Sequence, residues 1–325
     1  MSTDAARGSV VLQAQEPTRA ELLRGTVFVL LAGCCFGSIA PLTIIARRNG
    51  ATIQSVQSWR YVTAALLLIA IGAWIERRGK LHVEIPGAVP TSRTTKRPWF
   101  HPLILFVAGS GQSVVATMSL FALDYITAAT AGFLFYTYPM WVAVITAARG
   151  IERLTGIRMF ALAMALFGIV AMVGAPSAAS MHPAGVAFSL SSALIYAAYI
   201  PVLGVLQHGR EPLDVARAIS TGGAVLFVVW ALATSGMSSG LGFVELMASV
   251  GQGVLSAGAF LGFLGGLRVL GPVRTAITST IEPFWTTLLG VLLLGQVAGA
   301  GTVIGGLGSM VAVVLLQLRG RPARR

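Results

Sequence analysis

Ten stretches of mostly apolar residues divide this chain. Each holds about 20 residues, the length that crosses the roughly 30 Å hydrocarbon core of a bilayer as a helix. Charged residues make up only 10% of the 325 positions, against about 25% in soluble domains. The runs are continuous rather than alternating, which favours helices over the strands of a barrel. The sequence therefore predicts an all-α polytopic membrane protein. Its ten transmembrane helices are expected near residues 25–46, 53–75, 102–122, 126–147, 157–175, 184–206, 214–235, 244–266, 275–295 and 297–318.

The two halves of the chain repeat each other at matching spacing. The recurring pairs are Gly25 and Gly185, Phe28 and Phe188, Pro41 and Pro201, Leu123 and Leu267, and Pro139 and Pro283. Because each half holds five spans, an odd number, the second half must cross the membrane in the opposite direction. The prediction is two inverted five-helix repeats, at 25–175 and 184–318.

The net charge of +12 lies mostly on one side of the predicted spans. Twenty of the 23 Lys and Arg residues fall in segments that share a side with the N-terminus, whereas the opposite loops keep only Arg47 and Arg48. This is the positive-inside bias. It predicts a protein of the cytoplasmic membrane with an N-terminal tail, 1–24, and a basic C-terminal tail, 319–325, both in the cytoplasm. Since the charge reports topology, no nucleic-acid partner is expected.

Two charged residues, Arg60 and Glu282, fall inside predicted spans, near the middle of the bilayer. Each costs roughly 2.5–3.5 kcal/mol on insertion scales, so each is expected to face a cavity or a partner. Three roles stay open. Arg60 could bind a substrate carboxylate, Glu282 could take up a proton, or the two could form a fixed ion pair between the second and ninth spans.

Prolines inside the spans are expected to kink them and to free backbone carbonyls, because proline lacks an N–H. These prolines are Pro41, Pro139, Pro201 and Pro283. Aromatic and amide side chains nearby suit an amphipathic ligand, and packing is the alternative role of each. The candidate substrate-binding residues are Arg60, Tyr136, Tyr199, Gln112, Gln252 and Trp285.

Several local motifs resemble those of the EamA-like family of the drug/metabolite transporter superfamily. They are the stretch from Ala122 to Leu154 (ALDYITAATAGFLFYTYPMWVAVITAARGIERL), the Glu282–Pro283 pair, the triplet Phe36–Gly37–Ser38, and Arg60. The resemblance implies export or import of small metabolites such as amino acids. Glu152, at the end of the fourth span, is expected to act structurally as a local ion pair or cap.

The sequence holds no HExxH, Walker or paired-cysteine metal motif, so we expect neither an enzyme nor a bound metal or cofactor. The prediction is a secondary transporter that works by alternating access and moves an amino acid or a related small metabolite. A carrier of lipids or nucleotide sugars is the alternative, followed by an intramembrane enzyme or a channel. The expected partners are the small-molecule substrate and the lipid bilayer. The small-residue spacing of Gly301 and Gly305 leaves a homodimer possible.

Overall fold

The computed structural model describes residues 17–78, 101–152, 154–173, 181–238, 240, 242–295 and 300–318, and these form thirteen α-helices and no strand. In chain order they are α1 (Arg19–Gly37), α2 (Ile39–Arg48), α3 (Ile53–Arg78), α4 (Pro102–Ala122), α5 (Ala128–Phe135), α6 (Tyr138–Ala148), α7 (Gly156–Val173), α8 (Pro183–Leu206), α9 (Pro212–Ala233), α10 (Phe243–Leu270), α11 (Pro272–Thr278), α12 (Ile281–Leu294) and α13 (Ala300–Leu318). Most of the predicted N-terminal tail and all of the tail 319–325 lie outside the described residues.

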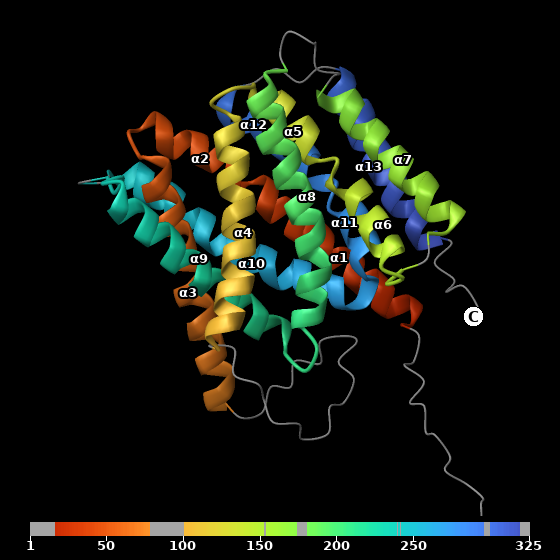
Figure 1. The fold of residues 1–325 in the computed structure, drawn as a ribbon, viewed down its shortest axis with the longest axis horizontal. Coiled ribbons are helices and arrows are strands. Elements are labelled where there is room, and N and C mark those ends of the chain that lie inside the picture. The colour runs from red at the N-terminus through yellow and green to blue at the C-terminus, as the bar shows by residue number, and fades with distance from the viewer. Residues whose placement is uncertain are drawn as a thin grey trace, which may run out of the picture.

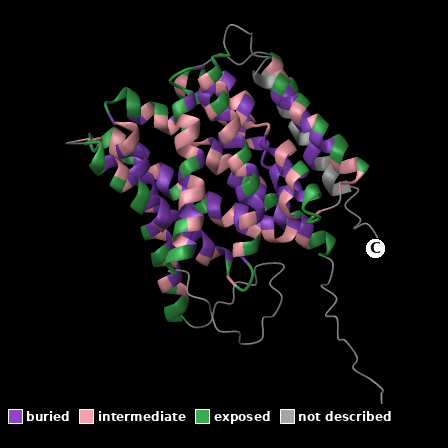
Figure 2. Ribbon diagram, in the orientation of Figure 1, coloured by how far each residue is buried: buried purple, intermediate pink, exposed green. Residues whose placement is uncertain are grey.

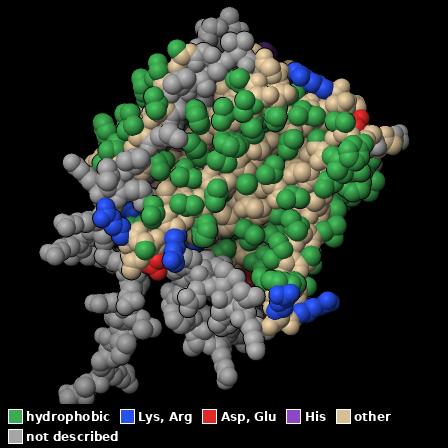
Figure 3. All heavy atoms as spheres, turned by 180° about the vertical axis from the view of Figure 1, so that it is seen from behind, with side chains coloured by type: hydrophobic (Ala, Val, Ile, Leu, Met, Phe, Trp, Pro, Cys, Tyr) green, Lys and Arg blue, Asp and Glu red, His purple; other side chains and the backbone are tan. Residues whose placement is uncertain are grey.

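Eight helical segments of the described chain are long and apolar enough to cross a membrane. They are Arg19–Arg48, Ile53–Arg78, Pro102–Ala122, Thr130–Ala148, Pro183–Leu206, Pro212–Ala233, Phe243–Leu270 and Pro272–Leu294, and Gly156–Ala171 is a shorter apolar helix. A broad apolar surface covers the side of the bundle, with the visible charged side chains near its edges (Figure 3). These features identify an integral membrane protein.

The first helix begins earlier than the expected span at 25–46. Thr18 and Glu21 form a capping box, in which each side chain accepts a hydrogen bond from the other residue's backbone N–H. This arrangement satisfies N–H groups that a helix start leaves without partners. The helix therefore starts at Arg19, and part of the segment expected to be a tail is helical.

Three of the predicted spans are interrupted. One residue, 38, separates α1 from α2. Two residues separate each of the other pairs, 136–137 between α5 and α6 and 279–280 between α11 and α12. Pro41, Pro139 and Pro283 each lie in the first turn of the helix that follows the interruption, where a missing N–H costs no hydrogen bond. Pro201 differs, because α8 continues through it.

Glycines allow several of these helices to approach closely. In α10, Gly262 and Gly266 face backbone atoms of α1, while Gly109 of α4 faces the backbone of Gly222 in α9. At the edge of the bundle α13 lies beside α7 (Figure 1), where Gly301 faces the carbonyl of Ala171. This glycine of the last helix is thus used for packing within the chain.

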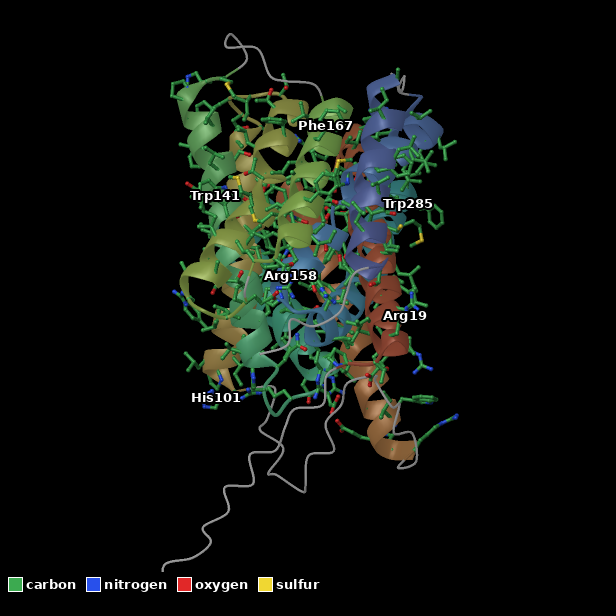
Figure 4. The ribbon with its side chains drawn as sticks, turned by 90° about the vertical axis from the view of Figure 1, so that its right-hand side faces the viewer. Arg19, His101, Trp141, Arg158, Phe167 and Trp285 are labelled. Carbon is green, nitrogen blue, oxygen red and sulfur yellow. The ribbon has the colours of Figure 1, made fainter. Side chains whose placement is uncertain are left out.

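Buried residues gather where the helices meet, and exposed ones lie at the periphery and the ends (Figure 2). We call the end that holds His101 and Arg19 the His101 end, and α7 runs away from it, from Arg158 toward Phe167 (Figure 4). Tyr61 and Tyr138 are among the largest fully buried side chains. Both lie beside the candidate site.

Candidate functional site

Arg60 is buried in α3 and is only 6% exposed. Its Nε donates a hydrogen bond to Ser256 Oγ of α10 at 2.7 Å, and Nη1 donates to Gln57 Oε1 at 3.3 Å. The guanidinium also lies 4.9 Å from the centre of the Tyr61 ring. Within the described residues no carboxylate lies within 4.0 Å of it. The structure therefore surrounds this charge with neutral groups and does not place it in a direct ion pair with Glu282.

A second arginine, Arg217 of α9, occupies a comparable position in the second half of the chain and is 4% exposed. Its Nη1 contacts Asp214 three residues earlier at 3.3 Å, as Arg60 contacts Gln57 three residues earlier. Arg217 also pairs with Glu76 at 3.5 Å. Carboxylates from both halves thus neutralise Arg217, whereas Arg60 contacts the amide of Gln57.

Glu282 lies in the first turn of α12, directly after the interruption that follows α11. The Tyr136 hydroxyl and the charge of Arg60 are near enough to act on its carboxylate electrostatically. Tyr138 and Tyr196 also interact with it electrostatically. Glu282 is therefore surrounded by tyrosines rather than by a cation in direct contact.

An aromatic cluster connects these two charged residues. Its members are Phe36, Tyr61, Phe135, Tyr136, Tyr138, Tyr196, Phe260 and Phe263, from α1, α3, the α5–α6 region, α8 and α10. Neighbouring ring centres lie between 4.8 Å (Tyr138 to Tyr196) and 6.5 Å (Tyr196 to Phe263) apart. These separations are typical of favourable aromatic pairs. The cluster gives the space between Arg60 and Glu282 an apolar, aromatic character.

The other candidate residues lie around this cluster in different ways. Gln112 interacts with Tyr61, and Gln252 is fully buried, accepts a hydrogen bond from Thr43 Oγ1 at 3.0 Å, and has an Nε2 without a partner in the described chain. Trp285 Nε1 donates to Ser38 Oγ at 2.9 Å, at the interruption between α1 and α2. Tyr199 donates its hydroxyl proton to the carbonyl of Ala108.

Of the predicted tyrosines, Tyr136 therefore lies against Glu282, whereas Tyr199 joins α8 to α4. Sequence reasoning did not select Tyr138 or Tyr196, although both stand near the span prolines. It also did not pair Arg217 with Arg60. A polar residue stands three positions before each arginine, Gln57 before Arg60 and Asp214 before Arg217, and this shared spacing could have linked the two arginines from sequence alone.

No group of three or more His, Cys, Asp or Glu side chains within the described ranges could hold a metal ion. The site consists of one buried cation, one carboxylate, amides and aromatic rings. Such groups bind a polar or zwitterionic molecule by charge, hydrogen bonds and ring contacts.

Comparisons with known proteins agree with this architecture. The chain is similar to the "Uncharacterized transporter YcbK" of Bacillus subtilis (strain 168), with 24% identity over 321 residues that cover 95% of this chain and 97% of that protein. A solved structure titled "Crystal structure of protein" shares the fold, with a TM-score of 0.73 and 18% identity over 90% of this chain and 96% of the other. The sequence model of the EamA-like transporter family matches residues 23–174 and 183–318. The resemblance found in the sequence is confirmed, and the chain belongs to the EamA-like transporter family.

Proposed function

We propose that this membrane transporter is a secondary carrier of a small zwitterionic metabolite, an amino acid or a close relative. The observation that carries the proposal is Arg60, a buried guanidinium with no carboxylate within 4.0 Å in the described chain. A buried charge is costly unless a partner compensates for it. A substrate carboxylate would supply that partner.

Glu282 provides the complementary group. Its carboxylate would hold the substrate's ammonium group, beside the faces of Tyr136, Tyr138 and Tyr196, which also attract cations. The aromatic cluster between Arg60 and Glu282 would accept an apolar side chain. When no ammonium group is present, the same carboxylate can take up a proton, so substrate binding and proton release would be coupled at Glu282.

The repeat supports a mechanism of alternating access. The family model matches twice in succession, and the interrupted pair α5–α6 corresponds to α11–α12. We propose ten spans in two inverted five-helix halves, with the seventh helix, α7, and α13 as the fifth and tenth spans. The basic residues near the His101 end favour a cytoplasmic location for that end and for both termini, in the cytoplasmic membrane.

Ligand-dependent stabilisation of the purified protein tests this proposal. A ligand that binds only the folded state raises the unfolding temperature. Amino acids should stabilise the protein, whereas matched amines that lack the carboxylate and acids that lack the ammonium group should not. Binding should strengthen as the pH rises in the wild type, because Glu282 must lose its proton, and Glu282→Gln should abolish this dependence. Stabilisation by the matched amines or acids alone would contradict the zwitterion proposal.

A further inference from the structure

The packing of the two interrupted spans differs between the ends of the bundle. Near the His101 end α6 packs against α11, and the Tyr138 hydroxyl donates a hydrogen bond to the Ala276 carbonyl at 3.4 Å. The corresponding pair in the repeat is α12 with α5, which lies toward the opposite end (Figure 1). Among the described residues α5 and α12 do not pack closely. Of the two corresponding pairs of interrupted helices, the one near the His101 end is therefore packed together and the other is not.

Glu152 reinforces the joined end. It lies in the loop between α6 and α7, in the first half of the chain, and contacts the start of α11 in the second half. One carboxylate oxygen accepts a hydrogen bond from the backbone N–H of Val273 at 3.2 Å. The other forms a 2.7 Å ion pair with Arg158 of α7. Arg158 lies in the half of the bundle nearer His101 (Figure 4).

The sequence at the start of α11 leaves room for this contact. Gly271 has a φ of +76°, a conformation that favours glycine, and a Cβ atom there would lie 2.7 Å from Glu152 Oε1. A side chain at position 271 would therefore displace the carboxylate as well as strain the backbone.

Glu152 is also the most buried carboxylate in the four salt bridges of the described chain, with a side chain 12% exposed. Burial raises the pKa of Glu152 above its ordinary value, against the opposing effects of Arg158, the Val273 N–H and Arg274. Holding the charged form at this position is thus costly and depends on these partners. Separating α11 from the α6–α7 loop would remove the contacts with Val273.

We infer that Glu152 is a latch that holds the first half of the protein to α11 and keeps the cytoplasmic side closed while the site opens outward. Opening toward the cytoplasm requires Glu152 to release Val273. The role of a latch rests on the proposed transport by alternating access, but the contact itself can be tested without a substrate.

The test uses a single cysteine at Val273→Cys, in a background where Cys34 and Cys35 are replaced by serine. Val273 is 1% exposed, and its backbone N–H is unchanged by the substitution. Inside-out membrane vesicles are treated with a water-soluble maleimide, and the labelling rate is measured. Glu152→Ala should raise the rate by about tenfold, the factor expected for the loss of a hydrogen bond to a charged group. Glu152→Gln should raise it less, because its amide oxygen can still accept from Val273.

Glu211→Ala is the matched control. It removes the 3.4 Å ion pair with Arg268, whose two partners both lie in the second half of the chain. Its labelling rate should equal that of the parent. Equal rates for Glu152→Ala and Glu211→Ala would overturn the latch.

Folding is checked by size-exclusion chromatography and thermal unfolding. If Glu152→Ala does not fold, Arg158→Gln is the second variant and should also raise the labelling rate, since it removes the cation beside the carboxylate. An unchanged rate in that folded variant would likewise overturn the latch. A protein that transports no amino acid but shows the increase would keep the latch and refute the proposed function. Transport of an amino acid without an increase in the labelling rate would keep the proposed function and refute the latch.

Discussion

At the scale of single residues, the two buried arginines show how partners determine the role of a charge. Arg217 is held by Asp214 and Glu76 and by the Leu68 carbonyl, to which its Nε donates at 3.2 Å. A Cβ atom at Gly72 would overlap its guanidinium, so α3 and α9 are built around it. Arg60 has neutral partners only in the described chain. Arg217 therefore stabilises the packing of α3 against α9, whereas Arg60 remains available to an anion.

Replacing each arginine by glutamine should separate these roles. Arg60→Gln should weaken amino-acid binding by about tenfold to a hundredfold, the effect of losing charged hydrogen bonds, while the unfolding temperature stays within about 2 °C. Arg217→Gln should instead lower the unfolding temperature by several degrees, because it removes the ion pairs and the backbone hydrogen bond of a buried guanidinium. Ligand binding and thermal unfolding of the purified variants provide both measurements. A large loss of stability in Arg60→Gln with unchanged binding would favour a structural role for Arg60.

The sequence could identify Arg60 and Glu282 because charge inside an apolar span is rare and costly. It could not decide which aromatic side chains surround them. Tyr196 and Tyr199 lie on the same helix three residues apart, yet one interacts with Glu282 and the other with Ala108. That choice depends on how α8 is rotated against its neighbours, which is determined by packing rather than by local sequence.

At the scale of helices, backbone approach depends on glycine at specific contacts. A Cβ atom at Gly109 of α4 would overlap the backbone of Gly222 in α9, and one at Gly222 would overlap the Leu105 carbonyl. Neither helix can move away easily, because α4 also packs against α8 and α9 against α3. The contact between α4 and α9 should therefore tolerate no larger residue.

Gly109→Ala should destabilise the protein by about 1–3 kcal/mol, the cost of overpacking a close contact. Gly204→Ala, in the comparable helix α8, is the matched control because a Cβ atom there has no neighbour within 4 Å. It should be neutral or stabilising, since alanine favours helix more than glycine does. Thermal unfolding in one detergent compares the two. Equal effects of both substitutions would show that the close approach of α4 and α9 is not required.

The helix ends and interruptions were only partly predictable. Proline marked the interruptions before Pro41, Pro139 and Pro283, because it cannot donate a backbone hydrogen bond. The same residue type at Pro201 left α8 continuous. The early start of α1 follows from the Thr18 and Glu21 capping box, a polar signal that hydropathy alone does not register.

At the scale of the whole molecule, the apolar spans and the family could be predicted, because a chain this poor in charge has few stable folds outside a membrane. The packing of α6 against α11 could not. If the two halves are inverted repeats, the sequence is compatible both with α6 packed against α11 and with α5 packed against α12. The hydrogen bond from the Val273 N–H to Glu152 lies near the His101 end, and it joins segments far apart in the chain. Sequence reasoning placed Glu152 in a local structural role, whereas its contact with α11 joins the two halves.

In the proposed function the protein carries a zwitterionic metabolite whose carboxylate binds Arg60. Counterflow in proteoliposomes tests it most directly: vesicles loaded with an unlabelled amino acid are diluted into a trace of the same labelled compound. We expect transient, saturable accumulation of label in the wild type and in the control Arg268→Gln, which loses an ion pair with Glu211 rather than a contact of Arg60. Arg60→Gln vesicles should accumulate none above empty vesicles. Counterflow in Arg60→Gln equal to that of the wild type, or no counterflow in the wild type for any amino acid tested, would show that the protein does not carry an amino acid through Arg60.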